Sequence, residues 1–299
     1  MIRRLRNSWL YRSSTLYRRL AGWFPPPIEA KPLMDLRYLT MGGASHLDIM
    51  VASLRSLAAS WPELPTLRVV VADETDPAVV HRRLNWWRGS REVVSWRAAA
   101  AWAAANVSPA LSRFAEREPM GRKMAAVFQA ATEGPVLYSD TDVLWFGYPD
   151  SIADLITAHE SVLAMSTDIY AAYDQRLVPH ELPELAAKPY YCAGIMFAKG
   201  RVFENDRLHA LLEFAAHDAI GLTEQTLFAM LDCALGGRRF PEDEIYLSDA
   251  DRFARSETFL GMPWAARHYV GQVRHLFWRD AVLLGRHRKL QKHSTEARA

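Results

Sequence analysis

The sequence of 299 residues predicts an α/β fold, with a mostly parallel sheet flanked by helices. The run "LRVVVAD" at 67–73 is continuously apolar and β-branched, which is typical of a parallel strand covered on both faces. Segments with helical periodicity separate the expected strands, as they do in βαβ units. Half of the residues are hydrophobic and 23% are charged, a composition that excludes a disordered chain.

The first half of the chain shows the alternation most clearly. We expect strands at 36–41, 67–73 and 91–96, a turn at Gly42-Gly43, and a helix at 45–61. Ser108 followed by Pro109 has the pattern of an N-cap before a proline at the first helical position. Another helix, from about 122 to 132, should end at Gly134-Pro135.

The second half begins with a strand, "VLYS" at 136–139, and continues the alternation. The further expected elements are helices at 151–160, 204–218 and 222–234 and strands at 161–166 and 190–200. From Gly236 we expect irregular, aromatic-rich structure that ends in the basic run "GRHRKLQKH". The predicted organisation is therefore a basic arm with a proline-rich linker (1–33), one domain (34–280) and a basic tail (281–299).

The arm carries six arginines and no acidic residue before Glu29. Its apolar residues recur at helical spacing and would form one stripe: Ile2, Leu5, Trp9, Leu16, Leu20 and Trp23. Three interpretations stay open, namely packing on the main domain, contact with an anionic membrane surface, and a targeting presequence. Pro25-Pro26-Pro27 should end the helix in each case.

Composition excludes several classes of protein. A net charge of +2 gives no reason to expect nucleic acid as a partner. Cys192 and Cys233 form no CxxC pair, so a disulfide framework or a zinc knuckle is not expected, and a reducing cytoplasm fits best. No apolar run approaches the roughly 20 residues that cross a bilayer. We therefore expect a cytoplasmic protein that is soluble or peripheral on the inner face of a membrane.

Two carboxylates, Asp140 and Asp142, stand one residue apart at the end of the strand "VLYS". They follow a buried strand and precede the apolar "VLWF", so burial would bring two repelling charges together. A divalent cation between them is the simplest compensation, because magnesium and manganese prefer carboxylate oxygen and keep positions open for phosphate. A helix cap or turn would account for one aspartate but not for both.

The segment "HYVGQVRHLFW" at 268–278 is the second candidate, with His268, Gly271 and Arg274 three residues apart. Glycine permits close approach of a ligand, arginine offers bidentate donors to phosphate, and histidine can complete a metal site. The alternative is a basic aromatic helix with a packed histidine.

Four segments in this order, "LYSDTDVLWF", "YYCAGIMFAKG", "TEQTLFAML" and "HYVGQVRHLFW", resemble the GT-A glycosyltransferases. The similarity is closest to the retaining family-eight type, which includes bacterial lipopolysaccharide galactosyltransferases and glycogenin. It covers roughly residues 34–280 and leaves the arm outside. The fold that it implies is a Rossmann-like, mostly parallel sheet.

The resemblance also implies roles for individual residues. Asp140, Asp142 and His268 would bind manganese or magnesium, with Asp140 close to the ribose of the nucleotide. Gly271 and Arg274 would face the pyrophosphate, and Arg274 replaces the usual lysine. The remaining implied positions are Arg122 or Lys123 against the donor, Gly194 in the donor-binding strand, and Gln225 near the anomeric carbon. The usual Asn-Ala-Gly is Cys192-Ala193-Gly194 here, so an amide that touches the donor sugar is missing.

The implied reaction is transfer of a hexose from a nucleotide diphosphate sugar, most simply a UDP-sugar, to a hydroxyl of a glycan or glycolipid. The family context is bacterial polysaccharide biosynthesis and a retaining mechanism. An inverting enzyme would instead need a carboxylate beside the acceptor, for which Glu224 and Asp168 qualify by type, although a cap or a solvated helix face explains them equally well. Two alternatives remain: a non-catalytic membrane-associated binding protein and a sugar nucleotidyltransferase. The second is disfavoured because "TMGGASHLD" has glycines but no nearby lysine or arginine.

Overall fold

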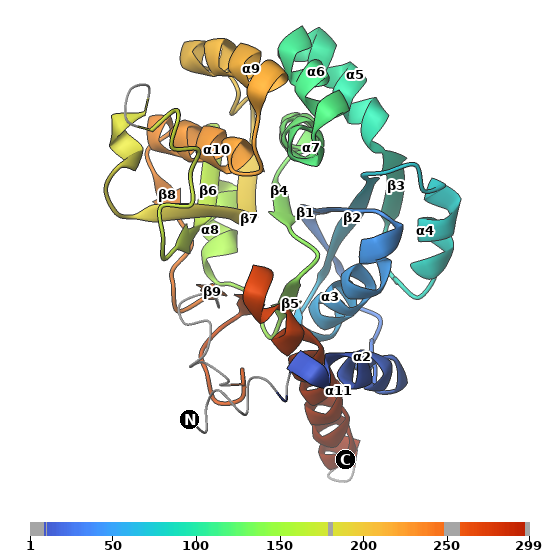
Figure 1. The fold of residues 1–299 in the computed structure, drawn as a ribbon. Coiled ribbons are helices and arrows are strands. Elements are labelled where there is room, and N and C mark those ends of the chain that lie inside the picture. The colour runs from blue at the N-terminus through green and yellow to red at the C-terminus, as the bar shows by residue number, and fades with distance from the viewer. Residues whose placement is uncertain (1–8, 10, 179–181, 248–257, 297–299) are drawn as a thin grey trace.

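A computed structural model describes residues 9, 11–178, 182–247 and 258–296. Its centre is a seven-stranded sheet with the strand order β3-β2-β1-β4-β7-β6-β8 (Figure 1). The strands are β1 (Leu33–Gly42), β2 (Leu64–Val71), β3 (Arg91–Ser95), β4 (Val136–Ser139), β6 (Val162–Asp168), β7 (Tyr190–Lys199) and β8 (Arg238–Arg239). All neighbouring pairs are parallel except the two that involve β7. The expected mixed α/β fold with a mostly parallel sheet is confirmed.

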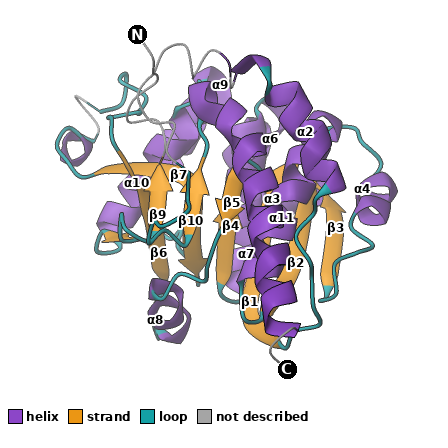
Figure 2. Cartoon of the chain, turned by 90° about the horizontal axis from the view of Figure 1, so that it is seen from below, coloured by secondary structure: helices purple, strands orange, loops and turns teal. Residues whose placement is uncertain are grey.

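Helices cover both faces of this sheet (Figure 2). One apolar cluster joins it to α5 (Trp96–Asn106), α6 (Pro109–Arg117), α7 (Pro119–Glu133), α9 (Asp206–Asp218) and α10 (Thr223–Ala234). A second cluster joins the opposite face to α3 (Leu47–Ser60), α4 (Pro77–Arg83) and α8 (Ser151–Thr157). Ser108 caps α6 as expected, because its hydroxyl accepts a hydrogen bond from the Ala110 amide.

A second, three-stranded sheet was not predicted. It consists of β5 (Val143–Trp145), β10 (Ala266–His268) and β9 (Ile245–Leu247), in the order β5-β10-β9. Each strand has only three residues, which is too short for a periodic pattern to be recognised in the sequence. The sheet nevertheless brings residues near 143 and 268 side by side.

The expectation of irregular structure after Gly236 was wrong for the last part of the chain. Helix α11 (Arg274–Glu296) is the longest helix of the described residues, and residue 281, where a separate tail was expected to begin, lies inside it. Its first turns are held by an apolar cluster that includes Ile49, Leu144 and Phe277. The division into arm, domain and tail stays a prediction.

Helix α2 (Ser14–Trp23) represents the arm and lies against α11 (Figure 1). Tyr17 and Ala21 contact the cluster at the start of α11, whereas Trp9, Leu16 and Trp23 are more than half exposed. The face that packs is therefore not the predicted apolar stripe, of which Ile2 and Leu5 lie outside the described residues. None of the helices in the described residues combines the length and hydropathy needed to span a membrane.

Candidate active site

The carboxyl end of β4 lies at a switch point of the sheet. Strand β1 has β2 on one side and β4 on the other, so the connections run in opposite directions from it. In open α/β sheets ligands bind in the crevice that forms outside such carboxyl ends. Asp140 follows β4 directly, and its amide donates to the carbonyl of Gly194 on β7 at 2.8 Å.

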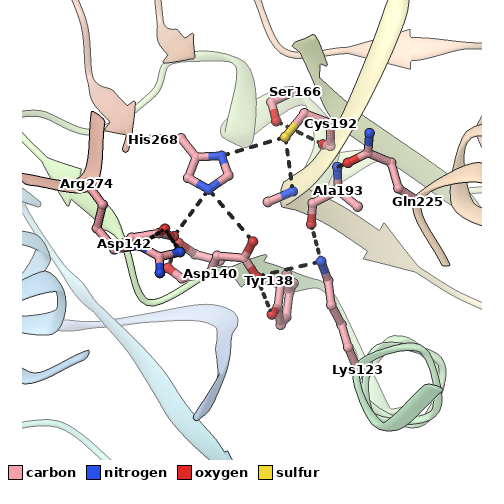
Figure 3. A network of polar contacts seen from close by, with 12 residues as sticks. Lys123, Tyr138, Asp140, Asp142, Ser166, Cys192, Ala193, Gln225, His268 and Arg274 are labelled. Atoms are coloured by element: carbon pink, nitrogen blue, oxygen red, sulfur yellow. Dashed lines mark hydrogen bonds and ion pairs between the residues drawn. The ribbon is translucent and has the colours of Figure 1, made fainter. Parts of the chain in front are cut away.

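Three possible metal ligands converge at this point (Figure 3). His268 Nε2 lies 3.2 Å from Asp142 Oδ1 and 3.7 Å from Asp140 Oδ2, and one ligand atom of each residue lies within 4.8 Å of the others. The small sheet creates this proximity, because His268 is the register partner of Val143 in the antiparallel pair of β10 and β5. Two carboxylates and one imidazole form a donor set that fits manganese or magnesium, as expected.

Gly194 makes room for the imidazole. A Cβ atom at this position would lie 2.0 Å from His268 Cε1, well inside contact distance. The Cys192 sulfur lies 3.6 Å from His268 Nδ1 and accepts a hydrogen bond from the Gly194 amide at 3.4 Å. The segment Cys192-Ala193-Gly194 therefore supports the histidine ring, a role that the sequence did not indicate.

Asp142 is buried and ionised. Burial by itself would raise the pKa of its carboxyl, but the charge of His268 and then that of Arg274 lower this pKa to about 2. The guanidinium of Arg274 donates to Asp142 Oδ2 through Nε at 2.9 Å and Nη2 at 2.6 Å. Burial lowers the pKa of His268, yet Asp142 outweighs burial and holds this pKa well above its usual value.

Asp140 is held on its other side by a buried lysine and a tyrosine. Tyr138 donates its hydroxyl to Asp140 Oδ1 at 2.6 Å, and Lys123 Nζ lies 3.6 Å from the same oxygen. Lys123 also donates to the carbonyl of Ala193 at 2.6 Å and lies 3.1 Å from Glu224 Oε1. Tyr138 stands two residues before Asp140, on the same face of the strand, and this spacing could have identified it.

Lys123 and Glu224 form a buried pair inside the site. Burial raises the pKa of Glu224 to about 7 against the opposing charge of Lys123. Burial lowers the pKa of Lys123, but Asp140 and Glu224 outweigh it and raise this pKa. Glu224 is thus neither a cap nor part of a solvated helix face.

These side chains line a cavity of about 300 Å³. The predicted residues around it are Lys123, Asp140, Asp142, Asp168, Gly194, Glu224, Gln225, His268, Gly271 and Arg274. Gly271 has a φ of +41°, a left-handed conformation that favours glycine. Arg122 is not among the lining residues, because its guanidinium donates to the carbonyl of Ala115 and stacks on Trp96.

Gln225 lines the cavity from α10 and Asp168 lines it from the end of β6. The Gln225 amide donates to the carbonyl of Ala172 at 2.8 Å and accepts from the Ala193 amide at 3.1 Å. Asp168 accepts a hydrogen bond from the Tyr170 amide at 3.2 Å. Gln225 therefore connects β7 to the loop after β6, and it fixes the wall of the cavity next to Gly194.

The sequence matches no protein-family model and no curated protein, whereas the fold matches solved glycosyltransferases. Mouse xyloside xylosyltransferase 1 in its apo form has a TM-score of 0.54 at 14% identity, over 80% of this chain and 99% of that one. Galactosyltransferase LgtC, in complex with donor and acceptor sugar analogues, has a TM-score of 0.53 at 14% identity, over 84% and 95%. Glycosyltransferase GlyE of Streptococcus pneumoniae TIGR4 has a TM-score of 0.52 at 13% identity, over 88% and 64%. The chain has the GT-A fold that the sequence motifs predict.

Proposed function

We propose that the chain is a metal-dependent glycosyltransferase that moves a hexose from a nucleotide diphosphate sugar, a UDP-sugar in the first instance, to a hydroxyl of a glycan or glycolipid. The observation that supports this most directly is the convergence of Asp140, Asp142 and His268 at the switch point of the sheet. The metal ion, the diphosphate and the sugar would then all bind in this one cavity. Solved proteins of similar fold transfer xylose or galactose according to their names, which agrees with a hexose or pentose donor.

Asp140, Asp142 and His268 would hold the manganese or magnesium ion, and a bound ion of this kind supplies Lewis acidity to a diphosphate leaving group. The charge that develops on the diphosphate also needs fixed donors. Arg274 presents a planar fork of N–H groups at the cavity edge and is about half exposed, so it can exchange part of its contact with Asp142 for phosphate oxygens. Lys123 contributes a fixed positive charge next to Asp140.

The sugar would lie between Gly194 and Gln225. Gln225 is held at both ends of its amide, so its position is set before a ligand enters, and pre-positioned groups lower the cost of reaching the transition state. We assign it to orienting the anomeric centre, with Asp168 on the same wall. Retention of configuration follows from the resemblance to the family-eight enzymes, since the only buried carboxylate on this wall, Glu224, is paired with Lys123 in the described residues.

Contact with an anionic membrane surface through α2 is the second part of the proposal. Leu16 and Trp23 are exposed next to Arg18 and Arg19 of the same helix, and Trp9 is exposed before it, a combination that favours the interface of an anionic bilayer. A glycolipid acceptor would be reached from that position, on the inner face of a membrane. The alternative function, a membrane-associated binding protein without catalysis, shares this feature and differs in needing no metal.

Two measurements test the catalytic proposal. In a thermal-shift panel of UDP, GDP, CMP and their sugars, manganese should be required for the largest rise in melting temperature, because selective binding to the folded state stabilises it. In a transfer assay with UDP-glucose and UDP-galactose, Asp142→Ala should abolish turnover and manganese-dependent UDP binding. Asp243→Ala removes an exposed aspartate outside the cavity and should behave as wild type. Full activity of Asp142→Ala, or of the wild type in excess EDTA, would exclude the mechanism.

A further inference from the structure

A second cavity, about 960 Å³, lies outside the catalytic site and shares no described lining residue with it. Its walls come from α2, α3, the end of α4 and Trp278 of α11. In Figure 1 the blue helices α2 and α3 lie next to α11 on one side of the main sheet. We call this hollow the arginine cavity, because its described lining contains five arginines: Arg18, Arg19, Arg55, Arg82 and Arg83.

Among the described lining residues of the arginine cavity, Asp48 is the one acidic side chain. Asp48 is already shared, since Arg18 contacts one of its oxygens and Arg83 donates to the other at 2.7 Å. The side chains of Arg19, Arg55 and Arg82 make no ion pair or hydrogen bond with any described residue. Several like charges are thus held around one space with a single carboxylate to compensate them.

The pKa of Arg55 reflects its burial and the repulsion between arginines in this cavity. Its guanidinium lies over the ring of Trp86, 4.9 Å from the centroid, and is half-buried. Burial lowers the pKa of Arg55, and the positive charge of Arg83 lowers it further. An anion in the cavity would remove this repulsion, because opposite charges at short range favour the ionised form.

The shape and lining of the cavity narrow the class of anion. Arginine forks bind phosphate oxygens in a bidentate manner, and five of them suit a group that carries more than one negative charge. Trp23, Trp86 and Trp278 add flat apolar surfaces around the same space, and Trp23 is 73% exposed. The ligand should therefore combine a phosphate group with an apolar or ring-bearing part.

We propose that the arginine cavity binds a phosphate group, presented either by a lipid headgroup or by a free phosphate compound, at a site separate from the catalytic cavity. Neither the proposed transfer reaction nor its metal requires this site. The exposed Leu16 on α2 and the exposed Trp9, which precedes this helix, favour the lipid-borne source, since a headgroup would enter the cavity from an adjacent bilayer.

The full-length protein can test this with two probes. Inorganic phosphate is titrated while tryptophan emission is recorded, because three tryptophans line the arginine cavity and no described lining residue of the catalytic cavity is a tryptophan. Vesicles of phosphatidylcholine, with and without about one fifth phosphatidic acid, are sedimented with the protein. The double variant Arg19→Ala/Arg82→Ala is compared with Arg201→Ala/Arg238→Ala, which removes the same charge from exposed positions that line neither cavity.

We expect the Arg19→Ala/Arg82→Ala variant to lose about tenfold or more in affinity, because charge-assisted hydrogen bonds to phosphate are lost, while the control variant keeps wild-type affinity. Dependence on Arg19 and Arg82 in the phosphate titration alone would identify a free phosphate compound as the source. The same dependence only with phosphatidic acid vesicles would identify a lipid headgroup. Equal binding by both variants, or no binding of either probe by the wild type, would overturn the proposal.

Discussion

The catalytic cavity and the arginine cavity both gather charged side chains, but only the first balances them within the chain. Lys123 faces Glu224 and Asp140, and Arg274 and His268 both face Asp142. The described lining of the arginine cavity has five arginines and one aspartate, and only Arg18 and Arg83 contact that aspartate. The lysine of the catalytic cavity is also deeply buried: Lys123 is 3% exposed, whereas the side chains of Arg83 and of Arg274, at the edge of the catalytic cavity, are each 52% exposed.

The two cavities differ in whether a charged side chain can remain without a partner. A buried charge without a partner costs several kcal/mol, so the catalytic cavity has to carry its own counter-ions. Half-exposed arginines remain hydrated and can stay unpaired until an anion arrives. Charge balance inside the protein thus indicates a pre-organised site, and imbalance near the surface indicates a site completed by its ligand.

The buried lysine provides the strongest test of this comparison. Lys123→Met should lower the free energy of unfolding by about 3–5 kcal/mol, because Glu224 is left buried without its partner. Urea denaturation at pH 7.5 measures this loss. The double variant Lys123→Met/Glu224→Gln should recover most of it, since no charge then remains unpaired. A loss under about 1 kcal/mol, or a double variant no more stable than the single one, would mean that the pair is not balanced as described.

A steric change tests the catalytic cavity without altering any charge. Gly194→Ala places a methyl group where the His268 ring lies, so the imidazole must leave Asp142. We expect transfer activity and manganese affinity to fall by about 100-fold, as when a metal site loses its geometry. Gly147→Ala is the matched control, because its Cβ would meet only Ala265 at an ordinary 3.8 Å. Manganese affinity within threefold of wild type in Gly194→Ala would contradict the assigned role of His268.

The sequence predicted the aspartate pair well, because a buried strand followed by two acids has few physical explanations. His268 was a candidate from the spacing in segment 268–278, but only the resemblance placed it beside the two aspartates, since the three-residue strands that bring it to Asp142 have no recognisable period. The sequence also could not show which of Arg122 and Lys123 lines the cavity. Neighbouring residues of a helix point about 100° apart, and only the packing of α7 shows that Lys123 enters the cavity.

Helix α11 and helix α2 were harder to predict for a different reason. Different parts of α11 contact different neighbours. The start of the helix packs on α3 and β5, whereas the carbonyl of Phe24 lies against Gly285 further along. Its pattern therefore lacks one apolar stripe. In α2 the predicted apolar stripe does not face the domain: Tyr17 and Ala21 pack on it, whereas Leu16 and Trp23 of the stripe are exposed. Periodicity identifies an amphipathic helix without showing which surface covers it.

Asp232 shows the effect of burial on a charged group outside both cavities, because it is buried and lines neither of them. Burial raises the pKa of its carboxyl to about 8, against the opposing charge of Arg239. A raised carboxyl pKa means that the folded chain retains a proton which the unfolded chain releases above about pH 4, so the contribution of Asp232 to stability is fully present below that pH and is lost as the pH rises toward 8. We expect the wild type to lose about 3 kcal/mol more than Asp232→Asn between pH 5 and pH 7.5 in urea denaturation. Parallel pH profiles would show that this carboxyl has an ordinary pKa.

The smallest expected effect is on the stability of the arginine cavity, and it has the opposite sign. Arg19→Ala/Arg82→Ala removes two charges that have no acidic partner among the described residues from a cavity that is also lined by Arg18, Arg55 and Arg83. The free energy of unfolding should stay the same or rise by up to about 0.5 kcal/mol, as is usual for surface changes. Arg201→Ala/Arg238→Ala breaks exposed ion pairs with Glu204 and Glu160 and should lower it by a few tenths of a kcal/mol. If the first variant instead loses more than about 1 kcal/mol, these arginines hold the fold together, and an anion is not needed to explain their clustering.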